Sequence, residues 1–175
     1  MRLKSFNTLM LIAALAAAGA LEAQNPLSND VKQSYNGIKS TLTRAAEEMP
    51  EADYSFSTVP GTTRTYGEII GHIADLQLML CGMAKGEPKR GDAESKKTKV
   101  ELTAALKESF DYCDSVYNSL TDADAVQMVK MFGRDVTKLS VLNFNIAHDN
   151  EMYGTAVAYL RIKGLVPPSS QPRRR

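Results

Sequence analysis

Apolar residues recur every three or four positions in four segments of this sequence, which is the spacing of one face of an α-helix. The segments cover about residues 28–49, 65–84, 98–120 and 137–163. Elsewhere, no alternation of apolar and polar residues is long enough to indicate a β-strand. Four helices of this length in a chain of 175 residues predict an all-α fold with a single four-helix bundle.

Local signals at the helix ends support these boundaries. Ser28 or Asn29 can cap the first helix. Pro50 ends it, because a proline disfavours helical geometry in the residue before it. Thr65 and Glu68 form a capping box, a hydroxyl three residues before a carboxylate, at the start of the second helix. These signals place helix ends independently of the apolar stripes.

The charged segment 85–97 contains Gly86, Pro88 and Gly91 and predicts an exposed crossover between the second and third helices. A connection of this length can either cross the end of the bundle or run along it. The pattern therefore leaves open whether the second and third helices are antiparallel or parallel.

Two cysteines, Cys81 and Cys113, fall in the second and third predicted helices. In an exported protein a pair of cysteines suggests a disulfide. Parallel helices would bring the two residues to a similar height, whereas antiparallel helices would separate them beyond the ~7 Å between Cα atoms that a disulfide can bridge. The alternative is two buried thiols that pack as small apolar side chains.

The fourth predicted helix carries two apolar stripes on nearly opposite sides. One stripe consists of Leu139, Leu142, Ile146, Tyr153, Val157 and Leu160. The other consists of Val141, Phe144, His148, Met152, Thr155, Tyr159 and Ile162. A helix that is apolar on both sides is either central in the fold or shared with another subunit. A homodimer formed through this helix is therefore one expected arrangement.

The first 23 residues have the pattern of a secretory signal peptide, with two cations, an apolar run from Leu9 to Leu21, and small residues up to Ala23. The apolar run is shorter than the ~20 residues that a membrane-spanning helix needs. We expect cleavage near Ala23 to give an exported, periplasmic or extracellular protein without a membrane segment. Residues 24–168 would then form the bundle domain and residues 169–175 a basic tail.

The charge balance excludes one class of function. The chain has 21 basic and 20 acidic residues, and the signal peptide contains two of the basic and one of the acidic residues, so the remainder has no net charge. Nucleic-acid binding requires a clustered basic face. The basic run Arg173-Arg174-Arg175 lies at the terminus. We therefore expect no nucleic-acid partner.

The two histidines, His72 and His148, fall on or beside the inward-facing stripes of the second and fourth helices. Bundles build metal sites in this way, because rigid helices hold imidazoles at a fixed separation. Two imidazoles alone make a weak site, since a catalytic zinc takes three protein ligands. The polar residues Asn145, Asp149 and Tyr153 are candidates for lining a pocket near His148.

Both histidines belong to longer stretches with a pattern of their own, MPEADYSFSTVPGTTRTYGEIIGHIADLQ (49–77) and AHDNEMYGTAVAYLRIKGLVP (147–167). In the first, a proline-containing linker and a Thr-capped helix lead to a histidine. The second has His-x-x-x-Met before a glycine and a proline. Over about residues 27–168 the chain resembles the DinB-like (DNA-damage-inducible) superfamily. The resemblance implies an up-down-down-up bundle, whose parallel second and third helices favour a bond between Cys81 and Cys113.

The resemblance also implies a divalent metal, usually zinc or nickel, bound by three histidines that correspond to His72, His148 and residue 152. Residue 152 is Met152, so the departure from the family pattern falls on a ligand. Characterised members of the family include thiol-dependent transferases and isomerases, and many others are described as metal-dependent hydrolases.

Three interpretations of Met152 remain open. In the first, Asp75, Glu68 or Glu151 supplies the third ligand, and the metal activates a water. In the second, two imidazoles and the thioether bind copper. In the third, no metal binds and Met152 packs as an ordinary apolar side chain. We favour the third, which predicts a non-enzymatic protein that binds a small molecule or a partner chain. The first predicts a metal-dependent hydrolase or thiol S-transferase, and the sequence identifies no substrate.

Overall fold

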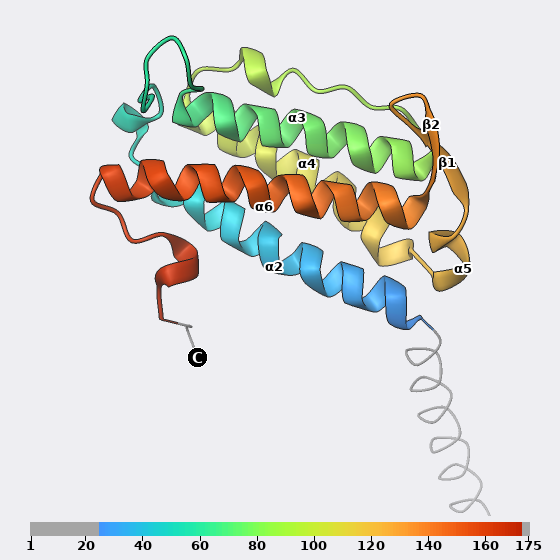
Figure 1. The fold of residues 1–175 in the computed structure, drawn as a ribbon. Helices are drawn as coiled ribbons and strands as arrows, with labels where there is room; N and C mark the ends of the chain where they lie inside the picture. Colours follow the sequence, from blue (N-terminus) through green and yellow to red (C-terminus); the bar gives the residue numbers. More distant parts are fainter. Residues whose placement is uncertain (1–24, 173–175) are drawn as a thin grey trace, which may run out of the picture.

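Four long helices lie side by side in the computed structural model of the protein (Figure 1), namely α2 (Pro26–Glu48), α3 (Tyr66–Lys85), α4 (Lys99–Ser119) and α6 (Lys138–Ile162). The structure describes residues 25–172, so the predicted signal peptide and the end of the basic tail lie outside the described residues. The short elements are η1 (Glu51–Asp53), η2 (Ala93–Ser95), α5 (Asp122–Ala125), β1 (Met128–Met131), β2 (Arg134–Thr137) and η3 (Pro168–Ser170). No helix within residues 25–172 has an apolar stretch long enough to cross a membrane. The four predicted helices are confirmed.

Contacts between the helices define an up-down-down-up bundle. α2 and α4 are antiparallel, since the ammonium of Lys99 at the start of α4 donates to the backbone oxygen of Met49 just after the end of α2. α3 and α4 are parallel, because Cys81 and Cys113 occupy similar heights and form a disulfide, with their Cα atoms 5.5 Å apart. The crossover, residues 86–98, runs back along the length of α3, as this arrangement requires (Figure 1). The predicted topology and the bonded alternative for the two cysteines both match the structure.

α6 packs between α2 and α3, and this position accounts for part of its second apolar stripe. His148 and Tyr159 of that stripe are buried and face aromatic or imidazole rings of α3. Phe144 and Ile162 remain 41% and 58% exposed. Contacts within one chain therefore bury only part of the second stripe, and a homodimer through this helix stays a prediction.

The start of α2 corrects the expected cap at Ser28 or Asn29. The helix begins at Pro26, whose missing N–H and fixed φ suit the first helical position. The Ser28 hydroxyl instead donates to the carboxylate of Asp122, at 2.8 Å. A side chain that looked like a local cap thus joins the first helix to α5.

A β-hairpin between α5 and α6 contradicts the expectation that no strands form. β1 pairs antiparallel with β2, and Phe132 and Gly133 make the turn between them. Their φ angles are 48° and 82°. Two positive φ angles define the type I′ turn, which matches the twist of a hairpin. The sequence signal was weak, because each strand has four residues and because a phenylalanine occupies a position where Asn or Asp usually marks this turn.

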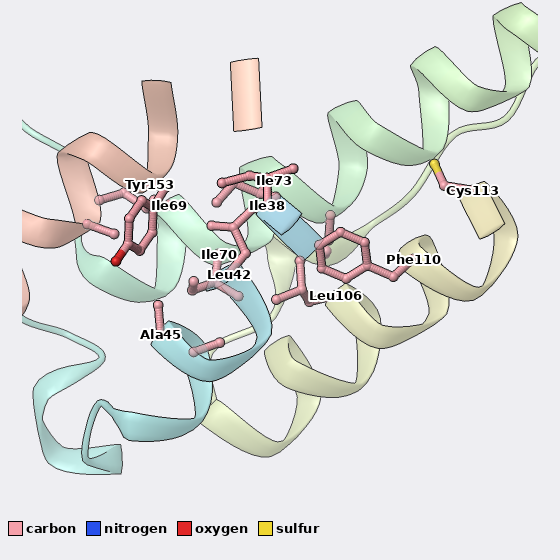
Figure 2. Close-up of a cluster of buried hydrophobic side chains, with 14 of the residues drawn as sticks. Ile38, Leu42, Ala45, Ile69, Ile70, Ile73, Leu106, Phe110, Cys113 and Tyr153 are labelled. Carbon is pink, nitrogen blue, oxygen red and sulfur yellow. The ribbon is translucent and has the colours of Figure 1, made fainter. Parts of the chain in front are cut away.

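The core lies where the apolar stripes of the long helices meet, and Figure 2 shows part of it. The labelled residues include Ile38, Leu42 and Ala45 of α2, Ile69, Ile70 and Ile73 of α3, Leu106 and Phe110 of α4, and Tyr153 of α6. Nearer the start of α2, Tyr35 stacks on Tyr117 of α4 with ring centroids 3.9 Å apart, and the Tyr35 hydroxyl donates to Asp114. The stacked rings therefore join α2 to α4.

Candidate functional site

His72 and His148 face each other across the seam between α3 and α6. Their Nε2 atoms are 3.3 Å apart. The two rings meet edge to face, at an interplanar angle of 69° with centroids 5.1 Å apart. His148 is 8% exposed, and His72 is half-buried. The antiparallel register of the two helices therefore brings together two residues that lie far apart in the sequence.

Glu94, in the short helix η2, is a third member of this group that the sequence did not reveal. Its carboxylate oxygen lies 2.6 Å from Nδ1 of His72. A carboxylate accepts here, so Nδ1 of His72 carries the proton and Nε2 is the atom turned toward His148. This is the arrangement that orients histidines in metal sites. No periodicity marks Glu94, because it lies in the crossover.

Close packing between α3 and the crossover holds Glu94 in place. The two oxygens of the Asp75 carboxylate accept backbone N–H groups, from Ala93 at 2.8 Å and from Glu94 at 3.0 Å. A Cβ atom at Gly71 would lie 2.8 Å from the carbonyl oxygen of Ala93, which is too close for any residue with a side chain. The crossover is therefore a fixed wall beside His72.

We expect Gly71→Ala to lower the free energy of unfolding by about 1 to 3 kcal/mol, the usual cost of forcing extra volume into a packed contact. The added Cβ would meet backbone atoms of Ala93 and Glu94, which cannot rotate away. The crossover would have to lift, and the hydrogen bond from His72 to Glu94 would break. Chemical denaturation measures the stability, and ¹⁵N NMR of the imidazole reports the bond at Nδ1.

Gly154→Ala is the matched control for this change. Gly154 is also inside a long helix, but it is exposed and a Cβ there would meet nothing within 4 Å. Alanine is the better helix former, by about 1 kcal/mol. Gly154→Ala should therefore stabilise the protein, and a similar gain from Gly71→Ala would contradict the close contact with the crossover.

His148 is neutral at pH 7. Burial, and to a smaller extent the neighbouring His72, lowers the pKa of His148 to about 4. When both rings are neutral, His148 donates from Nε2 to the free Nε2 of His72. Nδ1 of His148 then has no hydrogen-bond partner among residues 25–172. Its nearest acidic neighbour is Asp149, with Oδ1 4.0 Å away.

The structure places the three expected pocket residues in two different surroundings. Asn145 and Asp149 are fully buried, and the Asn145 amide donates to the hydroxyl of Tyr117. Burial raises the pKa of the Asp149 carboxyl well above its ordinary value. Tyr153 bonds instead to Ser169 in the C-terminal segment. Asn145 and Asp149 therefore lie inside the bundle, whereas Tyr153 joins α6 to the C-terminal segment.

Gln77 of α3 is another buried polar residue that the sequence did not single out. With its amide oriented to satisfy its neighbours, Gln77 donates to Oδ2 of Asp149 at 2.9 Å and accepts from the hydroxyl of Ser109 at 3.0 Å. The sequence gave no sign that Gln77 links α4 and α6, because a single glutamine beside an apolar stripe forms no motif.

The expected third ligands have other positions. Glu68 completes the capping box with Thr65, and both oxygens of Asp75 bond to the crossover. Glu151 is exposed, and Met152 is half-buried against the core, one helical turn after His148. Within the described part of the chain, no three His, Cys, Asp or Glu side chains converge on a point that could hold a metal ion.

The two imidazoles match half of a metal site. Nitrogen ligands ~2.05 Å from a tetrahedral zinc lie about 3.3 Å apart, which is the separation of the two Nε2 atoms. The same distance is within reach of a direct hydrogen bond between the rings. Two nitrogen donors do not make the three-histidine centre that the resemblance implies, so the residues present do not fit a catalytic divalent metal.

A groove of about 520 Å³ lies between α3 and the crossover, and it ends at His72. We call it the crossover groove. Its lining comprises His72, Asp75, Leu76, Met79 and Met83 of α3, and Pro88, Lys89, Arg90, Gly91 and Glu94 of the crossover. This volume is typical of small-molecule sites, which span about 300 to 1,000 Å³.

Comparisons with known proteins agree with the four-helix fold. The sequence pattern of the DinB superfamily matches residues 38–156, a stretch that contains both histidines. A DinB-like protein from Bacillus cereus ATCC 10987 has a similar structure, with a TM-score of 0.70 and 18% identity over 83% of this chain and 97% of its own. One from Bacillus subtilis has a TM-score of 0.67 and 20% identity, over 83% and 99%.

A mycothiol-dependent maleylpyruvate isomerase is also similar, with a TM-score of 0.59 and 17% identity over 75% of this chain and 60% of its own. At these identities the structural similarity shows the fold alone. No protein with curated functional information matches the sequence. The match to the superfamily pattern covers more than half of the chain, and the structure has the corresponding bundle with both histidines at its seam. The chain therefore belongs to the DinB superfamily.

Proposed function

We propose that this protein is an exported DinB-type bundle that binds a small molecule in the crossover groove and performs no divalent-metal catalysis. The observation that carries the proposal is the groove itself, which has an apolar floor and ends at His72 and Glu94. The disulfide between Cys81 and Cys113 supports export, because such bonds persist in oxidising compartments.

The absence of catalysis is supported by the engagement of the nearby carboxylates. Glu68 caps α3, Asp75 holds the crossover, and Glu94 accepts from His72. Moving any of them onto a metal would break a hydrogen bond that shapes the fold. The histidine pair therefore acts as a hydrogen-bonded structural group at the end of the groove.

Metal content measured by mass spectrometry tests this proposal, using residues 24–175 purified without a histidine tag. We expect well under one equivalent of zinc or nickel in the native protein. Met152→His should restore a third imidazole one turn after His148 and raise the content to about one equivalent. Adding His148→Ala to that variant should abolish the gain. One equivalent in the native protein, lost in His148→Ala, would instead support a metal-dependent hydrolase or thiol S-transferase.

A second candidate function is binding of copper(I). It is favoured by the 3.3 Å separation of the two Nε2 atoms together with the half-buried thioether of Met152 one turn after His148. Imidazole and thioether ligands suit this soft ion. Competition against a copper(I) chelator would test it. A stable complex that weakens in Met152→Leu supports copper, and equal binding by both proteins rejects the thioether as a ligand.

A further inference from the structure

We infer that the crossover groove binds an amphipathic organic anion, with its apolar part against α3 and its acidic group at Arg90. This inference rests on the proposed function, and it adds the chemical class of the ligand.

The floor of the groove is apolar and adaptable. Leu76, Met79 and Met83 lie at helical spacing on one stripe of α3, and each is half-buried. Methionine side chains adjust their shape to an apolar partner because they are unbranched and flexible. A ligand with an alkyl or aromatic body would cover these side chains and remove their apolar surface from water.

Two cations of the crossover, Lys89 and Arg90, and two carboxylates, Asp75 and Glu94, line the groove. Among residues 25–172, the acidic side chains near these cations already have partners, and Asp75 accepts from the backbone N–H groups of Ala93 and Glu94. Glu87 pairs with Lys85 at 3.0 Å, and Asp92 pairs with Lys96 at 2.8 Å. Arg90 forms no salt bridge within the described residues and is exposed at the rim.

Arg90 is the better anchor of the two cations at the rim. The ammonium of Lys89 lies 5.2 Å from the ring centroid of Tyr112, so that charge is directed toward α4. A guanidinium presents paired donors that match a carboxylate. At the other end of the groove, Glu94 carries negative charge beside His72. The acidic group of a ligand would therefore lie at Arg90, and its apolar part would extend over α3.

The wall of the groove is already formed without a ligand. A Cβ at Gly82 would lie 2.7 Å from the carbonyl oxygen of Glu87, so the start of the crossover is in close contact with α3. The far part of the wall is fixed by the bonds from Ala93 and Glu94 to Asp75. A preformed groove loses little entropy when a ligand binds.

A second groove, of about 490 Å³ between α2 and α4, provides an internal comparison. Its lining contains both acidic and basic side chains, and both of its lysines form ion pairs. Lys107 pairs with Asp111, and Lys39 pairs with Asp114. This groove therefore has no equivalent of Arg90, and Lys107→Gln is a matched control for Arg90→Gln.

The test uses ¹³C-methyl methionine NMR, in which Met79 and Met83 report occupancy of the crossover groove. The probes are octanoate, octanol and octylammonium, which share a chain length and differ in charge. We expect octanoate to shift both methyl signals in a saturable way and to bind best of the three. Arg90→Gln should weaken octanoate binding roughly tenfold or more, as expected for losing a charge-assisted hydrogen bond. Lys107→Gln should leave it unchanged.

The other outcomes separate the two levels of the proposal. If the three probes bind equally, or if Arg90→Gln has no effect, the groove binds small molecules but the inference of an anionic ligand is wrong. If none of the three shifts the signals of Met79 and Met83, the proposed function is itself rejected. Arg90→Glu adds a converse check, because it should favour octylammonium over octanoate.

Discussion

Reduction of the disulfide between Cys81 and Cys113 is expected to lower the free energy of unfolding by about 3 to 4 kcal/mol. The bond closes a loop with a sequence separation of 32 residues. Opening a loop of this size returns configurational entropy to the unfolded chain, and the chain-entropy relation gives the stated magnitude. The reduced protein retains the same helices but gains many more unfolded states. Guanidinium unfolding of the oxidised and reduced proteins measures the difference.

The double variant Cys81→Ala/Cys113→Ala is the control for this measurement. Its free energy of unfolding should equal that of the reduced native protein. Reductant should not change it, since the variant has no disulfide. Both sulfurs are fully buried, so reduction of the native protein requires denaturant followed by refolding in reductant. Equal unfolding midpoints for oxidised and reduced native protein would show that the bond contributes nothing to stability.

The bundle was predictable from the sequence because the signals for its helices are local. The stripe through Ile69, Ile73 and Leu80 has the spacing of one helix face, and these side chains are fully buried in the structure. The capping box of Thr65 and Glu68 forms with both of its hydrogen bonds. Such signals involve residues within a few positions of one another, so the sequence displays them directly.

The remaining features depend on contacts between distant segments. Glu94 reaches His72 because Asp75 bonds the backbone of the crossover and because Gly71 lets that backbone approach. None of these residues forms a motif in the sequence. The hairpin was missed for a different reason, since its turn relies on a phenylalanine with positive φ. A residue type that rarely adopts this conformation gives no local signal for it.

Asp149→Asn is expected to make the protein more stable at pH 7 and more sensitive to acid. Burial raises the pKa of the Asp149 carboxyl well above its unfolded value of 3.8. As the pH rises above 3.8, the unfolded chain releases this proton while the folded chain retains it. The aspartate therefore costs stability as pH increases, at about 1.4 kcal/mol per pH unit. Asparagine has nearly the same shape and does not titrate, so the variant avoids this cost.

His148 has the opposite pH dependence. Burial lowers its pKa from 6.5 in the unfolded chain to about 4 in the folded protein. Its contribution to stability is complete above pH 6.5 and is lost as the pH falls toward 4, because the unfolded chain takes up a proton that the folded chain does not. Over this window the loss amounts to about 3 kcal/mol. In the native protein the two neighbouring residues oppose each other between pH 4 and 6.5.

Urea unfolding between pH 4 and 7 separates the two contributions. In Asp149→Asn only the contribution of His148 remains, so the free energy of unfolding should fall by about 3 kcal/mol between pH 6.5 and 4. In His148→Gln only the contribution of Asp149 remains, so the free energy of unfolding should instead fall as the pH rises across the same window. The double variant lacks both contributions, so its stability should change less with pH than that of either single variant. If Asp149→Asn follows the native profile, the carboxyl is ionised in the folded protein. The bundle interior beside His148 would then hold a charge, which its complete burial and unpaired oxygen argue against.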